Sequence, residues 1–189
     1  MSDLTTSAPL ATPNDAVVSE FAHLATDERI DRAAAALASV GMAAIVVASG
    51  DEARLAVENL LPYGAEVFNN TSRTLEAIGV AEDIERSGRY QPLRLRLYQM
   101  DREMQQQEMR HLAASPDYVV GSAHAVTEDG SLLVSSASGS QLGPIVAGGG
   151  HVILVVGGQK IVADVATGMR RGRSDPHAGR THAIVHWRM

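Results

Sequence analysis

The chain has 189 residues, of which 45% are hydrophobic and 20% charged, and its formal net charge is -6. These values are typical of one globular domain with a core of its own, and the acidic balance argues against a general nucleic-acid binder. The absence of cysteine excludes disulfides, thiolate catalysis, zinc-thiolate sites and iron–sulfur ligation by this chain, so any redox centre must be supplied by a partner subunit.

The first residues predict neither a secretory signal nor a membrane anchor. Residues 1–14 are rich in Ser, Thr, Ala and Pro, lack a basic start and an apolar core, and predict a flexible leader. No apolar run approaches the roughly 20 residues that a membrane-spanning helix needs. We therefore expect a cytoplasmic protein that binds neither a membrane nor nucleic acid.

The first third of the chain alternates between helical and strand patterns. Helices are predicted at 15–25, at 26–40 and from the Ser49–Asp51 loop to about Leu61, with strands at 42–48 and 65–68. The first strand is apolar on both faces, as expected in a buried parallel sheet. The β-α-β alternation favours a doubly wound α/β layer.

A cluster of short polar side chains separates the second strand from an apolar helical start at Leu75. A polar strand end that faces a helix N-terminus is suited to an anion. The alternative is that Asn70 or Thr71 only caps the helix. The cluster supplies four candidate ligand-binding residues, Asn70, Thr71, Ser72 and Thr74.

The region between this cluster and Pro116 is less clear. Residues 83–100 fit a bent helix or an edge strand, because Gly88 and Pro92 interrupt the pattern. Residues 98–114 predict one helix that ends before Pro116. Its spaced methionines are more typical of core filling than of a cofactor site.

The segment 117–162 contains most of the polar candidates. Two apolar runs, at 117–120 and 151–156, have strand composition. In an open α/β sheet, ligands bind beyond the carboxyl ends of the strands. Beyond the first run lie Gly121 and Ser122, and beyond the second lie Gly157 and Lys160, the only lysine of the chain. We therefore expect a site at these strand ends.

A hairpin is predicted between the two runs, because Asp129-Gly130 between apolar segments is typical of a tight turn. Turn chemistry explains this dipeptide without any catalysis, although Thr127, Asp129 and Gly130 are also candidate ligand-binding residues. Glu128 is a candidate nucleophile or general base, or else an exposed turn carboxylate. His124 and Lys160 are candidates for stabilising an anionic intermediate.

The strand that returns from this hairpin, at 132–134, leads into a serine-rich segment ahead of an apolar helix predicted at 142–147. Hydroxyl and backbone donors in such a segment suit a phosphate or carboxylate. The segment matches neither the P-loop nor the dinucleotide fingerprint, and no Gly-x-Ser-x-Gly elbow is present. Its candidate ligand-binding residues are Ser138, Gly139, Ser140 and Gln141.

The C-terminal region predicts no metal site. A helix or short connection is expected after Lys160, and three arginines, Arg170, Arg171 and Arg173, fit a solvated helix end. Residues 181–187 alternate like a strand, which separates the two histidines of that tail along one face, and no carboxylate accompanies them.

Four segments together resemble the LUD (lactate utilisation) domain family, of the NagB/RpiA/CoA-transferase-like superfamily. They are VFNNTSRTL (67–75), VGSAHAVTEDG (120–130), SGSQ (138–141) and VVGGQKIV (155–162). The resemblance covers roughly residues 20–172. It implies a three-layer α/β/α fold with a mostly parallel central sheet and a β-hairpin. The expected domain spans 15–172, between the leader 1–14 and a divergent or truncated segment 173–189.

Some family members accompany iron–sulfur subunits in the bacterial oxidation of lactate to pyruvate. The resemblance therefore implies an accessory or ligand-binding component of organic-acid utilisation, with a small organic anion or an acyl or CoA compound as its ligand. Iron–sulfur oxidoreductase subunits and a second copy of the chain are the implied partners, and no cofactor is expected in the chain itself.

Two alternatives stay open. The TEDG sequence at 127–130 is similar to the Ser-Glu-Asn-Gly motif whose glutamate forms the acyl-CoA adduct in CoA-transferases, which implies an acyl-transfer enzyme that uses Glu128. The other alternative is a purely structural partner of an iron–sulfur oxidoreductase.

Overall fold

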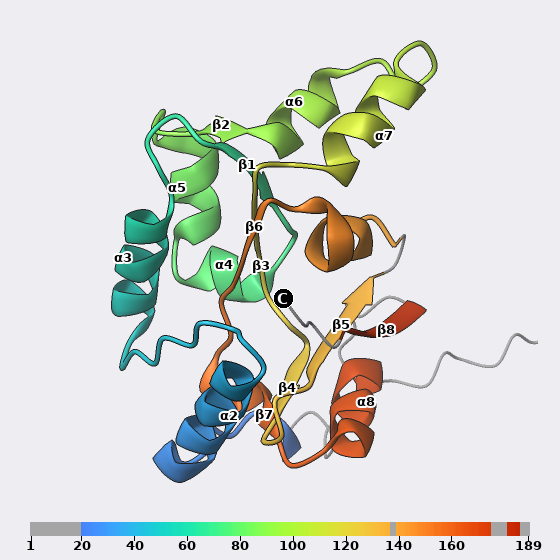
Figure 1. The fold of residues 1–189 in the computed structure, drawn as a ribbon. Helices are drawn as coiled ribbons and strands as arrows, with labels where there is room; N and C mark the ends of the chain where they lie inside the picture. Colours follow the sequence, from blue (N-terminus) through green and yellow to red (C-terminus); the bar gives the residue numbers. More distant parts are fainter. Residues whose placement is uncertain (1–19, 137–138, 175–180, 186–189) are drawn as a thin grey trace, which may run out of the picture.

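A parallel sheet forms the centre of the protein. The computed structural model describes residues 20–136, 139–174 and 181–185. Four strands pair in the order β2-β1-β3-β6, and every pair is parallel (Figure 1). Their bounds are β1 Glu66–Asn69, β2 Gln91–Pro92, β3 Tyr118–Gly121 and β6 His151–Leu154.

Both faces of this sheet are buried, which explains why its strands are apolar on both sides. On one face, Val67 and Val120 pack against the helices on the left of Figure 1. On the other face, Val119 packs against Val134 and Ile145. The helices of the first face are α3 Gly50–Leu60, α4 Arg73–Ala77 and α5 Val80–Arg86. The α/β/α fold class predicted from the sequence is confirmed.

A second, mixed sheet lies beyond the carboxyl ends of the first. Its strand order is β7-β4-β5-β8, with β4 and β7 parallel and the other pairs antiparallel. The predicted hairpin is formed by β4 and β5, and Gly130 in its turn has a φ of 87° that favours glycine. The bounds are β4 Ala125–Thr127, β5 Leu132–Ser136, β7 Ile161–Val162 and β8 Thr181–Val185.

Two strands of the first sheet continue into the second. The chain passes from β3 through residues 122–124 into β4, and from β6 through residues 155–160 into β7. We call these two connections the junction segments. Because β3 pairs with β6 and β4 pairs with β7, both in parallel, the junction segments run side by side.

The remaining helices surround the two sheets. The α6 and α7 helices project together at one end of the molecule, and α8 packs on β4 and β5 (Figure 1). Among the described helices, none is long and apolar enough to cross a membrane. The bounds are α2 Asp27–Ser39, α6 Leu93–Gln99, α7 Gln106–Ala114, η1 Pro144–Gly148, η2 Gly158–Lys160 and α8 Val165–Ser174.

The strand predicted at 42–48 is wrong. This segment is extended but belongs to neither sheet, and the side chain of Ile45 is 61% exposed. In the order β2-β1-β3-β6 the outer edge of β6 is free of any described strand, and the 42–47 segment lies along β6 across an apolar groove without pairing to it. An apolar strand-like sequence was therefore not sufficient to enter the sheet.

The single helix predicted at 98–114 is also wrong, because the chain breaks between α6 and α7. The Asp101 carboxylate accepts hydrogen bonds from the backbone N–H groups of Glu103 at 2.8 Å and of Met104 at 3.1 Å. Such local side-chain bonds compete with helical backbone pairing. The ambiguous region 83–100 contains the end of α5, β2 and α6, and the helix expected at 142–147 is the π-helical turn η1. The helix predicted at 15–25 lies largely outside the described residues.

Substitution of an exposed isoleucine and of a buried leucine, two side chains of equal size, tests the position of the 42–48 segment. We expect Ile45→Ala to change the free energy of unfolding by no more than about 0.5 kcal/mol, as is usual for surface substitutions. Leu75→Ala, at a fully buried side chain of the core, should cost about 2–5 kcal/mol. Urea denaturation of both variants measures the difference. Equal losses would mean that Ile45 is buried and that the segment is a strand after all.

Candidate ligand-binding site

The junction segments bring Lys160 and Ser122 together. The Lys160 ammonium donates a hydrogen bond to the Ser122 hydroxyl at 2.9 Å, and that hydroxyl is positioned to donate to the Ala123 carbonyl at 3.3 Å. The two residues lie 38 positions apart in the sequence, but their segments are neighbours because the strands on either side of them pair. The ammonium, from a half-buried residue, is therefore held beside a buried hydroxyl at the end of β3.

Asn70 lies at the end of β1, next to the same strand end. Its backbone N–H donates to the Val120 carbonyl at 2.9 Å, which continues the β1–β3 ladder. The residue is 3% exposed, and neither its amide nitrogen nor its amide oxygen has a hydrogen-bond partner among the described residues. Leaving a buried polar group without a partner costs about 1–3 kcal/mol.

Glycine at position 121 makes room for this amide. A Cβ atom at Gly121 would lie 2.7 Å from the Asn70 amide nitrogen, closer than real Cβ contacts allow. The Asn70 amide therefore lies directly against the backbone of Gly121, one residue before Ser122. Three of the predicted site residues are thus adjacent to one another at the β1 and β3 strand ends, and Lys160 joins them from the β6 side.

Arg171 links the two junction segments from α8. Its guanidinium donates to the His124 carbonyl at 2.7 Å and to the Gln159 carbonyl at 3.3 Å. The prediction that Arg171 is a solvated helix end is wrong, because its cation binds main-chain oxygens of both segments. The spacing of Arg170, Arg171 and Arg173 in the sequence did not predict this contact.

His124 has a structural contact of its own. Its imidazole Nδ1 accepts a hydrogen bond at 3.1 Å from the backbone N–H of Ser135, on β5. This geometry assigns the ring a proton on Nε2 and a lone pair on Nδ1. The ring therefore helps to hold the end of β5 against the junction, and its predicted catalytic role stays a prediction.

Glu128 binds to α2. Its carboxylate accepts from the guanidinium groups of Arg29 at 2.5 Å and Arg32 at 2.8 Å. These two hydrogen bonds, Arg29 first, hold the pKa of Glu128 below its usual value. The carboxylate therefore ties the hairpin to α2, and acyl transfer by Glu128 gains no specific support from this geometry. Sequence reasoning missed both arginines, because nothing local connects α2 with the hairpin.

The rest of the TEDG sequence forms the turn. The Thr127 hydroxyl contacts the Asp129 carboxylate and also accepts from the backbone N–H of Ser131 at 2.8 Å. The hydrogen bond from Thr127 lowers the pKa of Asp129. The predicted tight turn is confirmed. Ligand binding by Thr127, Asp129 and Gly130 stays a prediction.

The other polar candidates lie in turns and caps. Ser72 caps α4, since its hydroxyl accepts from the backbone N–H of Leu75 at 3.4 Å, and Thr71 before it is exposed. Gly139, with a φ of 77°, bonds to the Ser136 hydroxyl in the turn that leads to η1. Ser138 lies outside the described residues. Ligand binding by Thr74, Ser140, Gln141 and Gly157 stays a prediction. Among the described residues, no three His, Asp or Glu side chains could hold a metal.

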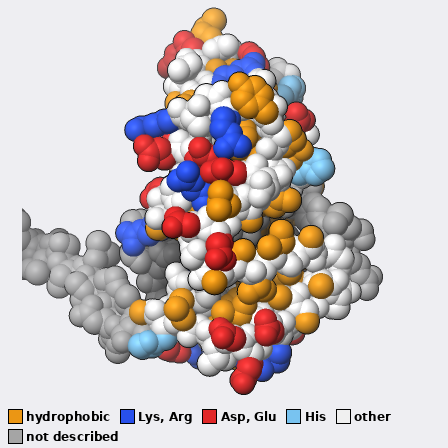
Figure 2. All heavy atoms as spheres, turned by 90° about the vertical axis from the view of Figure 1, so that its left-hand side faces the viewer, with side chains coloured by type: hydrophobic (Ala, Val, Ile, Leu, Met, Phe, Trp, Pro, Cys, Tyr) orange, Lys and Arg blue, Asp and Glu red, His pale blue; other side chains and the backbone are white. Residues whose placement is uncertain are grey.

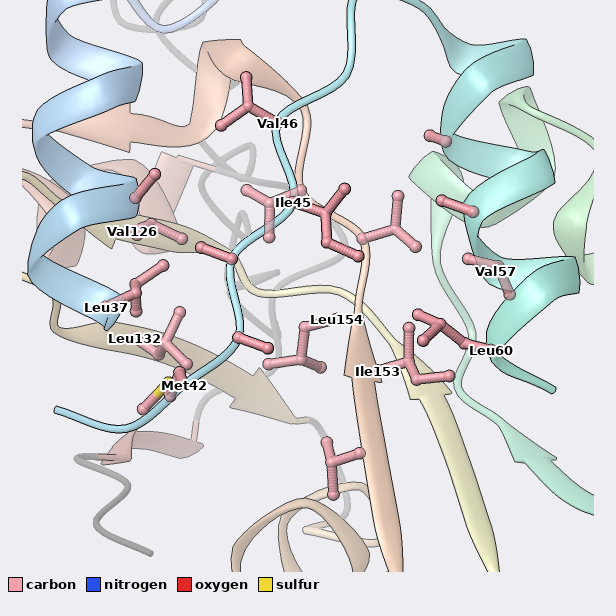
Figure 3. Close-up of a pocket in the computed structure, with 18 of the residues that line it drawn as sticks. Leu37, Met42, Ile45, Val46, Val57, Leu60, Val126, Leu132, Ile153 and Leu154 are labelled. Atoms are coloured by element: carbon pink, nitrogen blue, oxygen red, sulfur yellow. The ribbon is translucent and has the colours of Figure 1, made fainter. Parts of the chain in front are cut away.

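An apolar groove of about 660 Å³ lies beside β6 and the start of its junction segment (Figure 3). It is bounded by α2, the 42–47 segment, α3 and β6, and Figure 2 shows hydrophobic side chains gathered on this face. Leu37, Ile45 and Leu60 line it together with Ile153 and Leu154. Asn70, Ser122 and Lys160 are not among its lining residues. Val155 and Val156 of the junction segment do line it, so the groove adjoins the junction without including the polar side chains at the strand ends.

The fold and these contacts define an α/β protein with a polar site where the parallel strands β1, β3 and β6 end. The sequence model of the LUD domain matches residues 30–183, and the chain belongs to the LUD domain family. The predicted resemblance is thus confirmed. Membership of this family associates the protein with lactate utilisation in general. Searches of curated proteins and of solved structures gave no significant match.

The ion pairs of Glu128 predict a pH-dependent contribution to stability. Because the folded-state pKa is lowered, the contribution is fully present above the unfolded-state pKa, about 4.3, and is lost as the pH falls through the folded-state pKa. We expect Glu128→Gln to be less stable than the parent at pH 7 and the difference to shrink below about pH 4. Urea denaturation across this pH range measures it.

Glu82→Gln is the matched control, because Glu82 pairs with Arg86 on an exposed helix surface and should contribute little at any pH. A Glu128→Gln effect that does not change with pH would contradict the assigned ion pairs.

Proposed function

We propose that the protein is a ligand-binding component of lactate utilisation that binds a small organic carboxylate at the junction of its two sheets. Lys160, Ser122 and Asn70 form the site. The observation that carries the proposal is the 2.9 Å contact between Lys160 and Ser122, together with the buried, unpartnered amide of Asn70, which lies against Gly121, the residue before Ser122. Family membership supports the metabolic setting.

The site chemistry matches a carboxylate. An ammonium has three donors and a full positive charge, so its hydrogen bonds to a carboxylate are charge-assisted. Ser122 adds a hydroxyl that can donate, and Asn70 adds an amide N–H. Partial burial strengthens these interactions, because the local dielectric is lower than in water.

The composition supports an accessory role. The chain has no cysteine, so any iron–sulfur clusters that take part in lactate oxidation are carried by partner subunits. In this proposal, the chain holds the organic acid, and the redox chemistry belongs to those partners. A second copy of the chain is the other partner that the family resemblance implies.

Removal of the ammonium tests the site. We expect Lys160→Met to weaken lactate binding by about tenfold or more, because a hydrogen bond to a charged group contributes about 1.5–3 kcal/mol. Ser122→Ala should weaken binding less, since it removes a neutral hydroxyl. Isothermal titration calorimetry measures both affinities, and circular dichroism confirms that each variant is folded.

Arg170→Met provides the control, because it removes a cation from the exposed surface of α8. It should leave the affinity unchanged. Equal binding by the parent and Lys160→Met would overturn the proposed site.

A further inference from the structure

Asn70 differs from its neighbour in how its amide is used. Asn69 donates from its amide nitrogen to the Glu85 carboxylate at 2.8 Å, so the chain supplies a partner for that nitrogen, although the Asn69 amide oxygen has none among the described residues. Asn70 is as deeply buried, but both of its amide atoms lack one among the described residues. Its position is fixed by the backbone bond to Val120 and by the close approach to Gly121. A buried donor and a buried acceptor are thus held without a partner at the end of β1.

An amide edge is complementary to a group that offers one donor and one acceptor. A 2-hydroxy carboxylate presents such an edge, because its hydroxyl can donate to the amide oxygen while a carboxylate oxygen accepts from the amide nitrogen. A 2-oxo carboxylate presents two acceptors, so its keto oxygen would face the amide oxygen without a proton between them. A carboxylate without a substituent at this carbon leaves the amide oxygen unpaired.

We propose that Asn70 determines specificity at this site and selects 2-hydroxy carboxylates over 2-oxo carboxylates. The inference rests on the proposed function, in which Lys160 and Ser122 hold the carboxylate. Asn70 then hydrogen-bonds to the substituent on the carbon next to the carboxylate. Because the amide is shielded from solvent in this structure, ligand entry must shift the residues that cover it.

The affinities of the full chain for lactate, pyruvate and propionate test this inference. We expect lactate to bind at least about tenfold more tightly than the other two, because each of them leaves a buried polar atom of the site unpaired. In Asn70→Leu, which removes both polar atoms at similar size, the three affinities should fall within about threefold of one another. Isothermal titration calorimetry gives all six values.

Two further variants separate selection from folding. Asn69→Leu is the matched control: it removes the amide that donates to Glu85, leaves the Arg94–Glu85 ion pair, and should lower the melting temperature while keeping the preference for lactate. Asn70→Leu should melt no lower than the parent, because it removes an unpaired buried amide. Gly121→Ala keeps the Asn70 side chain but displaces its amide, and should reduce the preference as well.

The outcomes distinguish this inference from the proposed function. Equal affinity of the parent for lactate, pyruvate and propionate would overturn the selection by Asn70 and leave carboxylate binding in place. A preference for lactate that persists in both Asn70→Leu and Gly121→Ala would also overturn it. Binding of none of the three ligands by the folded parent would overturn the proposed function itself.

Discussion

The parallel pairing of β3 on both of its edges is the constraint on which the rest of the structure depends. Helices cover one face of β3, and β5 and η1 cover the other, so all its residues after Tyr118 are buried. The strand continues through the junction into β4, as its neighbour β6 continues into β7. The pairing of β3 with β6 is therefore continued by that of β4 with β7, and the junction segments between them meet side by side.

Polar side chains that would be unfavourable inside the buried sheet lie at the junction segments. Backbone pairing ends there, so side chains and helices supply the missing partners: Arg171 binds the carbonyls of His124 and Gln159, and Lys160 binds the Ser122 hydroxyl. Asn70 stands apart, because its backbone is paired and its amide is not. A site in which most groups are satisfied and one amide is left open combines a stable frame with a place for an outside partner.

Glu128 illustrates how motif and structure diverge. The TEDG sequence resembles a catalytic motif, yet two guanidinium groups of α2 bind the glutamate carboxylate and keep it ionised. Ion pairs of this kind join elements that are distant in sequence, and here they attach α2 to the hairpin. The arginines on which this contact depends lie far outside any local motif.

The sequence by itself determined the elements that depend on local chemistry. It predicted α2, α3, β1, β3 and the hairpin, whose Asp129-Gly130 turn needs only neighbouring residues, and its motifs identified the family. Tertiary structure alone decided what depends on distant partners. The 42–48 segment has strand composition but lies outside both sheets, although β6 beside it has an edge free of any described strand, because strand composition does not determine whether backbone pairing forms. The meeting of Lys160 with Ser122 and the unpaired amide of Asn70 likewise follow from strand register, which no local pattern encodes.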